Sequence, residues 1–299
     1  MKILCIGQSI YDINIPLNGF INENYQYTFI DKISSGGGIA ANTAYLLGKW
    51  GMETHFAGVI GYDSFGQKIK KELTDNKVNT TFLETNYEAK TPQNIIFTNQ
   101  NNKSKTGIKI ISEEYQLKRY KWDFTPNIIF SDGFEYNASL DALTKFPLAT
   151  TFVYATSPSK EIQELCKKTK YIIATSTFAQ TLTGLTIDFN NPQSLLKIYE
   201  DLKFRFKNTE IILCLNEKGN LYTINNSIKI MPSINYQNID SSGSDDSFCG
   251  AFIYAHANGY DNENAVKLAT IAAGLAVTKY GARLSIPSLA EVLEYYEKH

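Results

Sequence analysis

The sequence predicts an α/β fold: a mostly parallel central sheet with helices on both faces, and a small β-sheet beside it. Strand-like and helix-like runs alternate through much of the second half of the chain, which is typical of βαβ units. Two stretches, about residues 13–35 and 90–112, break this alternation because they contain strand patterns alone. At 299 residues the chain is long enough for one large domain, and we expect residues 1–299 to form a single one.

The first half of the chain supplies the opening strand, the two β-only stretches and two helices. Its opening apolar run is short and continuous, as in a buried strand, and a helix of small residues follows a glycine cluster. Later, a polar turn between two apolar runs indicates a β-hairpin. We expect strands at residues 2–7, 13–17, 25–33 and 54–60, helices at 39–50 and 63–73, and a hairpin at 92–111.

The second half alternates short apolar runs with amphipathic segments. One later helix should begin near Ser244, because Phe248, Phe252 and Ala255 then fall on one face. The segment 263–281 is nearly all apolar, so we expect it to be buried. We expect strands at residues 127–132, 150–155, 171–176 and 210–216, and helices at 138–146, 159–168, 195–206, 263–281 and 288–299.

The two β-only stretches are far apart in sequence, yet they can meet as one small sheet beside the main domain. A sheet placed next to an open α/β crevice is suited to act as a lid over a ligand. The alternative is that these are peripheral strands with no such role. Tyr27, Phe29 and Phe97 lie in these stretches and either line the ligand pocket or pack the small sheet.

The composition excludes several classes of function. Lys and Arg number 29 against 30 Asp and Glu, and this balance argues against nucleic acid or a membrane as a partner, since both require a basic surface. The four cysteines form no CxxC pair, and the three histidines lack metal-ligand spacing. The chain shows no signal-peptide pattern and no apolar run of transmembrane length, so we expect a cytoplasmic protein.

The junction DSSGSDDSFCGAFIYA, residues 240–255, joins small and acidic residues to an apolar helix. The first N–H groups of a helix have no intrahelical partners and, with the helix dipole, favour an anion such as phosphate. Gly243 allows the backbone to approach a ligand closely. The alternative is an ordinary N-cap with acidic first-turn residues, which stabilises a helix by ~1 kcal/mol.

The segment GGGIAA, residues 36–41, fits the G-x-G-x-x-A pattern of dinucleotide-binding proteins. In those proteins the pattern directly follows the first strand of the βαβ unit. Here the first strand lies about thirty residues upstream. A nicotinamide or flavin enzyme is therefore a weak alternative, and the absence of G-x-x-x-x-G-K-[ST] excludes a P-loop enzyme.

Three segments together resemble the ribokinase/PfkB family of sugar and nucleoside kinases: GQSIYD near the start, GGGIAANTAYLLGKWG with the following METHFAGVIGYDSFG, and the junction at residues 240–255. The resemblance covers essentially the whole chain. It implies a ribokinase-like three-layer fold with a β lid, which in dimeric relatives pairs between two subunits. The first family signature is matched by Gly37, Gly38, Ala40, Asn42, Ala44, Gly51 and Gly61, and the second by Asp240, Ser241, Gly243, Ser244, Asp245, Asp246, Gly250 and Ala251.

The resemblance also implies an activity: transfer of a phosphoryl group from ATP, with Mg²⁺, to a hydroxyl of a sugar or sugar-like substrate. It makes Asp246 the catalytic base. The positions that it assigns to other roles are an anion hole at Gly243, Ser244, Asp245 and Asp246; a substrate pocket at Asp12, Gly37, Gly38 and Asn42; nucleotide contacts at Asn216, Gly219 and Gly243; and a monovalent-cation site, for K⁺, at Asp240 and Ser241.

The sequence departs from the family pattern where relatives carry N-x-x-E, a motif that serves magnesium. Thr175 and Phe178 stand at its Asn and Glu positions, and Asp245 replaces the usual glycine of the anion hole. We hypothesise that Asp245 takes over part of magnesium binding, the alternative being a side chain turned to solvent. A catalytically impaired relative that only binds its ligand, and a nucleoside kinase, remain alternatives. A sugar is favoured because no aromatic base-stacking motif stands out in the lid.

Overall fold

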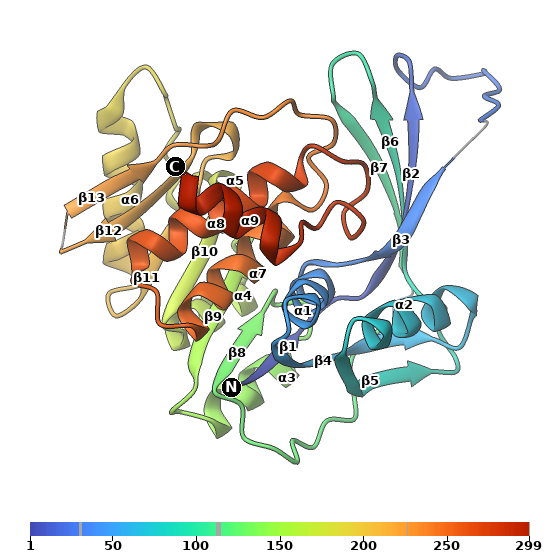
Figure 1. Ribbon diagram of the computed structural model, residues 1–299, viewed down its shortest axis with the longest axis horizontal. Coiled ribbons are helices and arrows are strands. Elements are labelled where there is room, and N and C mark those ends of the chain that lie inside the picture. Colours follow the sequence, from blue (N-terminus) through green and yellow to red (C-terminus); the bar gives the residue numbers. More distant parts are fainter. Residues whose placement is uncertain (30–31, 112–114, 226, 299) are drawn as a thin grey trace.

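The computed structural model describes residues 1–29, 32–111, 115–225 and 227–298. A large sheet with helices on its two faces forms the main body, and a small sheet projects from one end of it (Figure 1). This arrangement confirms the predicted α/β class with a mostly parallel sheet and a small separate one. None of the helices in the described part of the chain has the length and hydrophobicity that a bilayer crossing requires.

The large sheet contains nine strands within the described residues, and seven of them are parallel. The remaining two strands lie at one edge and pair antiparallel. In spatial order the strands are β13 (Ser227–Met231), β12 (Asn220–Ile224), β11 (Glu210–Cys214), β10 (Tyr171–Thr175), β9 (Thr150–Ala155), β8 (Ile128–Ser131), β1 (Lys2–Ile6), β4 (Glu53–Gly61) and β5 (Val78–Asn86).

Helices cover the two faces of this sheet in two separate hydrophobic cores. Alternate residues of β1 show the division: Ile3 and Cys5 pack into one core, and Leu4 and Ile6 pack into the other. The first core includes α1 (Ile39–Lys49), α2 (Ser64–Asp75), α7 (Ser244–Ala257), α8 (Asn262–Ala276) and α9 (Leu289–Lys298). The second includes α3 (Tyr136–Lys145), α4 (Lys160–Lys168), α5 (Ser176–Thr183) and α6 (Pro192–Arg205).

The two β-only stretches meet in the small sheet, as predicted. Its order is β3 (Ile33–Gly37), β2 (Ile10–Leu17), β6 (Gln93–Asn99) and β7 (Lys105–Ile110). The central pair, β2 and β6, is parallel, and the outer pairs are antiparallel. The sheet therefore joins chain segments about eighty residues apart next to the amino end of α1 (Figure 1).

The strand predicted at residues 25–33 is wrong over most of its length. Residues 25–29 are not in a strand, residues 30 and 31 lie outside the described part, and β3 begins only at Ile33. The register explains the difference, because β2 starts at Ile10 and pairs it with Gly37, so the glycine-rich segment supplies the partner strand. The aromatic residues of this segment lie in a loop instead, where the Tyr27 hydroxyl donates a hydrogen bond to the carbonyl oxygen of Phe20.

Four elements do not appear among the predictions: β5, α5, β12 and β13. The sequence of β5, VNTTFLETN, is polar because this strand lies at an edge of the sheet. The β12–β13 hairpin forms the opposite edge and exposes much of β13. One helix is also shorter than predicted, because α8 ends at Ala276 rather than near residue 281. The chain beyond α8 then crosses towards α1, where it contributes to the site described next.

Candidate active site

The amino ends of α1 and α7 meet beside the small sheet. Gly38 precedes α1 with a φ of 95°, a conformation that favours glycine. A Cβ on Gly38 would lie 2.3 Å from the carbonyl oxygen of Gln8, and one on Gly37 would lie 2.0 Å from Oδ2 of Asp12. The glycine cluster therefore allows β2 and its carboxylate to pack directly against the start of α1.

Asp12 presents a half-buried carboxylate from β2 at this junction. Its Oδ1 accepts a hydrogen bond of 3.1 Å from Nδ2 of Asn94 on the neighbouring strand β6. Burial raises the pKa of Asp12 to about 6, although Asn94 and the charge of Arg283 act in the opposite direction. The side chain is thus an acceptor that a ligand with hydroxyl groups can satisfy.

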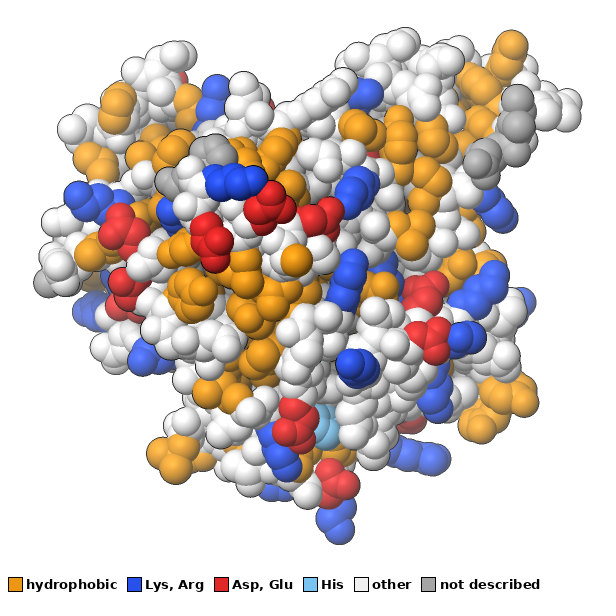
Figure 2. Space-filling model, viewed as in Figure 1, with side chains coloured by type: hydrophobic (Ala, Val, Ile, Leu, Met, Phe, Trp, Pro, Cys, Tyr) orange, Lys and Arg blue, Asp and Glu red, His pale blue; other side chains and the backbone are white. Residues whose placement is uncertain are grey.

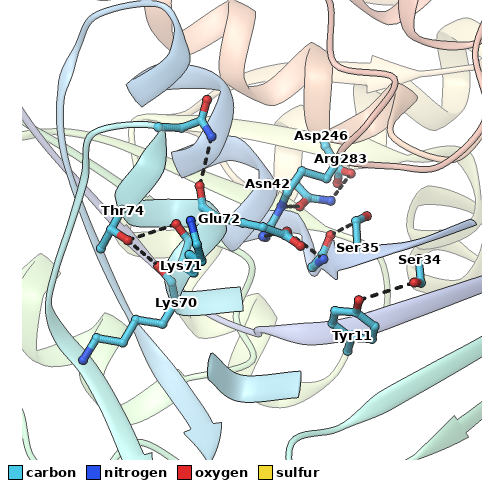
Figure 3. A network of polar contacts seen from close by, with 12 residues as sticks. Tyr11, Ser34, Ser35, Asn42, Lys70, Lys71, Glu72, Thr74, Asp246 and Arg283 are labelled. Atoms are coloured by element: carbon cyan, nitrogen blue, oxygen red, sulfur yellow. Dashed lines mark hydrogen bonds and ion pairs between the residues drawn. The ribbon is translucent and has the colours of Figure 1, made fainter. Parts of the chain in front are cut away.

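Asp246 lies in the first turn of α7 and is 4% exposed. Its Oδ2 accepts a hydrogen bond of 2.8 Å from Nδ2 of Asn42 on α1, which Figure 3 shows pointing at it. Burial raises the pKa of Asp246 to about 7, Asn42 lowers it, and the neighbouring charges of Asp245 and Asp12 raise it further. A carboxyl group that titrates near neutrality is suited to general-base chemistry.

The start of α7 lacks an ordinary N-cap. The residue before the helix is Gly243, with a φ of 81° and no side-chain capping bond. A Cβ on Gly243 would lie 2.4 Å from the carbonyl oxygen of Ala282, so the turn requires glycine there. With no side chain capping the first N–H groups, this helix end has the form of an anion site, as the sequence predicts.

Asp245 does not turn to solvent. Its Oδ2 accepts a hydrogen bond of 2.6 Å from the hydroxyl of Tyr154, at the carboxyl end of β9. Burial raises the pKa of this half-buried carboxyl group. Within the described residues no group of three or more His, Cys, Asp or Glu side chains could hold a metal by itself. Protein Mg²⁺ sites often use only one or two carboxylates, and substrate phosphates and water supply the other ligands. Asp245 therefore fits the role of a single protein ligand to Mg²⁺.

A cavity of about 640 Å³ opens at the carboxyl ends of β1, β8 and β9. The chain adds β4 and β5 on one side of β1 and later adds β8 on its other side, so the strand order reverses at β1. Open α/β sheets bind ligands at such a point. Asp132 lines this cavity, and its Oδ2 accepts bonds from the N–H groups of Gln8 and Ala40. Burial raises its pKa to about 6. The sequence analysis missed Asp132, although an acidic residue directly after a buried strand is a usable signal.

Glu135 is a second acidic residue of this cavity that the sequence analysis missed. Its Oε2 accepts a bond of 2.7 Å from the N–H of Leu117, and its buried Oε1 has no partner among the described residues. Burial raises the pKa of Glu135 to about 7. The cavity therefore combines the buried carboxyl group of Glu135 and the half-buried one of Asp132 with Lys109 from β7.

Two of the three residues expected to contact a nucleotide, Asn216 and Gly219, lie after β11, and the third, Gly243, lies at the start of α7. Asn216 begins a short 3₁₀ turn and lines a cavity of about 140 Å³, and Gly219 closes that turn with a φ of 101°. Thr175 caps α5 by accepting from the N–H of Phe178, whose side chain is fully buried. Phe178 therefore belongs to the core, and α5 offers no carboxylate at this position.

Asp240, which the resemblance assigns to a monovalent-cation site, pairs with a lysine of the small sheet. The Oδ1 atom of Asp240 lies 2.7 Å from Nζ of Lys105 on β7 and accepts a hydrogen bond from the N–H of Ser242. Its Oδ2 atom accepts hydrogen bonds from the side-chain amide of Asn14 and from the N–H of Gly281. Burial alone would raise the pKa of Asp240, but Lys105 and the N–H donors hold it below its usual value. A positive charge already occupies the position, and the neighbouring Ser241 is exposed.

Comparisons with known proteins point to one family. A family model described as "pfkB family carbohydrate kinase" matches residues 1–123 and 136–289. The chain is 24% identical to a nucleoside kinase of Methanocaldococcus jannaschii, in an alignment that covers 100% of this chain and 97% of the relative. It is 25% identical to a ribokinase of Haemophilus influenzae, in an alignment that covers 94% of this chain and 92% of the relative.

Solved structures show the same fold. The ribokinase of Cryptococcus neoformans in complex with ADP superposes with a TM-score of 0.83 at 22% identity, covering 98% of this chain and 99% of that one. The ribokinase of Thermotoga maritima gives a TM-score of 0.81 at 21% identity, covering 100% and 99%.

Proposed function

The chain belongs to the pfkB family of carbohydrate kinases, as the sequence resemblance predicts, and we propose that it transfers the γ-phosphoryl group of ATP to a hydroxyl of a sugar or sugar-like substrate. It is a phosphotransferase with an alcohol acceptor. The observation that carries the finer proposal is the position of Asp246: a buried carboxylate that titrates near neutrality, at an uncapped helix end.

In the proposed reaction Asp246 accepts the proton of the attacking hydroxyl. The hydroxyl oxygen forms a bond to the γ-phosphorus as the bond to the β-phosphate oxygen breaks, and ADP leaves. Backbone N–H groups of Gly243, Ser244, Asp245 and Asp246 stabilise charge on the transferred group. Asp12 and Asn42, with the close backbone of Gly37 and Gly38, hold the acceptor. A magnesium ion bound with the nucleotide, held in part by Asp245, would further neutralise the phosphate charge.

Two features bear on the substrate class. The lid aromatics Phe29 and Phe97 lie 6.3 Å apart between ring centres, and Phe29 also stacks on Tyr27, so these rings pack on one another. This favours a sugar. A nucleoside is the second candidate, because Phe134 and Tyr136 line the large cavity and offer aromatic faces to a base.

The test is a coupled assay of ADP release over a panel of sugars, phosphorylated sugars and nucleosides. Turnover of a sugar well above background, lost in Asp246→Asn, supports the proposal. Turnover restricted to nucleosides supports the second candidate. Ligand binding by calorimetry without any turnover indicates the catalytically impaired relative instead.

Asp245→Gly is expected to raise the Mg²⁺ concentration needed for half-maximal activity. A carboxylate beside the phosphate site repels the nucleotide unless a divalent cation lies between them, and removing it takes away a ligand. Titration of MgCl₂ at saturating ATP measures the effect. Tyr154→Phe is the matched control, because it removes only the hydrogen bond to Asp245. An unchanged or lower Mg²⁺ requirement in the glycine variant contradicts a metal role.

The rate is expected to be independent of K⁺, because the ammonium of Lys105 already neutralises Asp240. The measurement compares KCl with tetramethylammonium chloride at equal ionic strength. In Lys105→Met the carboxylate loses its cation, and K⁺ should then stimulate the rate. Several-fold stimulation of the unmodified protein by K⁺ would show that Lys105 does not replace the ion.

Pairing of two copies through the lid stays a prediction. Hydrophobic side chains gather over the small sheet, at the upper right of Figure 2. Ile108 and Ile110 of the edge strand β7 are 51% and 50% exposed. An exposed edge strand with an apolar face is suited to pair with another strand.

A further inference from the structure

The large cavity at the carboxyl ends of β1, β8 and β9 adjoins the proposed reaction site. Ile39, at the start of α1, lines this cavity, and so does Tyr154, whose hydroxyl donates to Asp245 in the proposed anion hole. Its volume of about 640 Å³ is within the range of small-molecule binding sites. An acceptor next to Asp246 would therefore lie against the walls of this cavity, and the chemistry of the walls decides which acceptor fits.

Glu135 is a wall residue whose hydrogen bonding is incomplete. It is 3% exposed, and its Oε2 accepts a hydrogen bond of 2.7 Å from the N–H of Leu117, which holds the carboxyl group in place. Its Oε1 is buried and has no hydrogen-bond partner among the described residues. Asp132, by contrast, accepts backbone N–H groups with both of its oxygens. Of these two carboxyl groups, Glu135 is thus the one with an oxygen left for a ligand.

Local structure does not explain a glutamate at this position. Glu135 directly precedes α3, but its side chain makes no capping hydrogen bond to that helix. The bond that it accepts from Leu117 requires a single oxygen, which a glutamine would supply without a charge. Burying a carboxylate is costly unless the charge is paired or hydrogen-bonded. A ligand that supplies the missing donor accounts for both the free oxygen and the charge.

The charges around the cavity favour a positive group on that ligand. Among the described residues that line the cavity, Lys109 is basic, and Asp132, Glu135 and Glu161 are acidic. Burial raises the pKa of Glu135 to about 7, and the charges of Asp132 and Glu84 raise it further. A cation beside this carboxyl group would therefore stabilise its ionised form. A phosphate or carboxylate group on the ligand would be repelled instead.

Aromatic side chains complete this environment. Phe134, Tyr136 and Tyr154 line the same cavity as Glu135. An ammonium group is attracted to the face of an aromatic ring as well as to a carboxylate, because both present negative charge to it. The lining thus combines two kinds of side chain that bind organic cations.

We propose that Glu135 is a specificity-determining residue that binds a protonated amino group of the acceptor, so that the acceptor is an amino sugar or an amino polyol and not a sugar phosphate or a sugar acid. This inference rests on the proposed function, because it places the acceptor of the phosphoryl transfer in the cavity. In the complex the ammonium group donates a hydrogen bond to Oε1 of Glu135, while Oε2 keeps its bond from Leu117. A hydroxyl of the same molecule faces Asp246.

The first experiment measures binding without nucleotide, by isothermal titration calorimetry at about pH 7. The probes are glucosamine, galactosamine, mannosamine, fructosamine and glucamine. Each is compared with its parent hydroxyl compound, with its N-acetyl derivative, which has no charge, and with a phosphate of the parent. At least one amino compound should bind about tenfold or more tightly than its parent, because a charge-assisted hydrogen bond is roughly twice as strong as a neutral one. The N-acetyl derivatives should bind no tighter than the parents, and the phosphates should bind more weakly.

Glu135→Gln should abolish this preference. The amide oxygen can still accept from the N–H of Leu117, but the group has no charge, so an amino compound and its parent should bind with about equal affinity. Glu200→Gln, which removes the same charge from the exposed side of α6, is the matched control and should keep the preference. The ratio of the two affinities reports on the ammonium contact, because a general loss of stability would weaken the binding of both compounds.

The proposal is overturned if no amino compound binds the unmodified protein tighter than its parent, and equally if the amino preference persists in Glu135→Gln. Should that variant not fold, a crystal structure of the unmodified protein with the tightest amino compound decides. An amino nitrogen more than about 4 Å from both carboxyl oxygens of Glu135 then overturns the proposal.

The assay of ADP release separates this inference from the proposed function. Phosphorylation of an amino compound, with the preference seen in binding, supports both. Turnover restricted to uncharged sugars, sugar phosphates, sugar acids or nucleosides overturns the inference while the chain remains a kinase. Binding of an amino compound that depends on Glu135, without turnover of any member of the panel, supports the contact with the amine and shows that the proposed function fails.

Discussion

Asp246→Asn is expected to lower kcat by ~10²–10⁴-fold, because an amide keeps the shape of the carboxylate but cannot accept the hydroxyl proton. The hydrogen bond from Asn42 and the backbone of α7 place this oxygen at the helix end, so the loss should be in kcat with nucleotide affinity retained. In the unmodified protein, activity should fall as the pH drops below about 7, where Asp246 becomes protonated. Steady-state kinetics with the best substrate of the panel measure both effects.

The variant should remain folded. The pKa of Asp246 is about 7 in the folded protein and about 3.9 in an unfolded chain, so the stability linked to this group is present at low pH and lost as the pH rises through 7. An asparagine does not ionise, so the variant does not lose this stability as the pH rises. Its melting temperature at about pH 8 should therefore be no lower than that of the unmodified protein. Asp201→Asn, a change on α6 at a half-buried aspartate that pairs with Arg205, is the control. A kcat close to that of the unmodified protein would mean that another group is the base.

Asp12→Ala is expected to raise KM for the acceptor steeply with little change in nucleotide affinity. The carboxylate can accept two hydroxyl hydrogen bonds, and a bond to a charged group contributes ~1.5–3 kcal/mol. Since 1.4 kcal/mol corresponds to about tenfold in affinity, KM should rise by roughly 10- to 100-fold or more. Initial rates over a range of acceptor concentrations at saturating ATP give the value.

The pH dependence gives an independent check on Asp12. Its pKa of about 6 means that KM of the unmodified protein should rise as the pH falls below that value, and this rise should vanish in the alanine variant. Asp75→Ala, an exposed aspartate on α2 paired with Lys71, is the control. If KM stays unchanged in Asp12→Ala, the lid carboxylate does not contact the acceptor.

The sequence by itself determined those parts of the molecule that local chemistry controls. Continuous apolar runs and helical periodicity identify most strands and helices of the main sheet, because burial on one face imposes a spacing along the chain. The close packing around residues 36–38 and Gly243 is equally predictable from the sequence. A close approach of other atoms or a positive φ excludes residues other than glycine at these positions. These features lead to the fold class and the lid sheet, whereas Asp246 and Asp12 were chosen through the resemblance to a known family.

The tertiary structure decided what depends on contacts between distant segments. The partner of β2 is the glycine-rich β3 rather than the aromatic run at 25–29, because pairing register and not propensity selects it. Lys105 on β7 forms an ion pair with Asp240, and Arg283 reaches Asn42 from 241 residues away. A buried charge is stable only where the whole fold supplies its partners, and no local pattern in the chain records which partners those are.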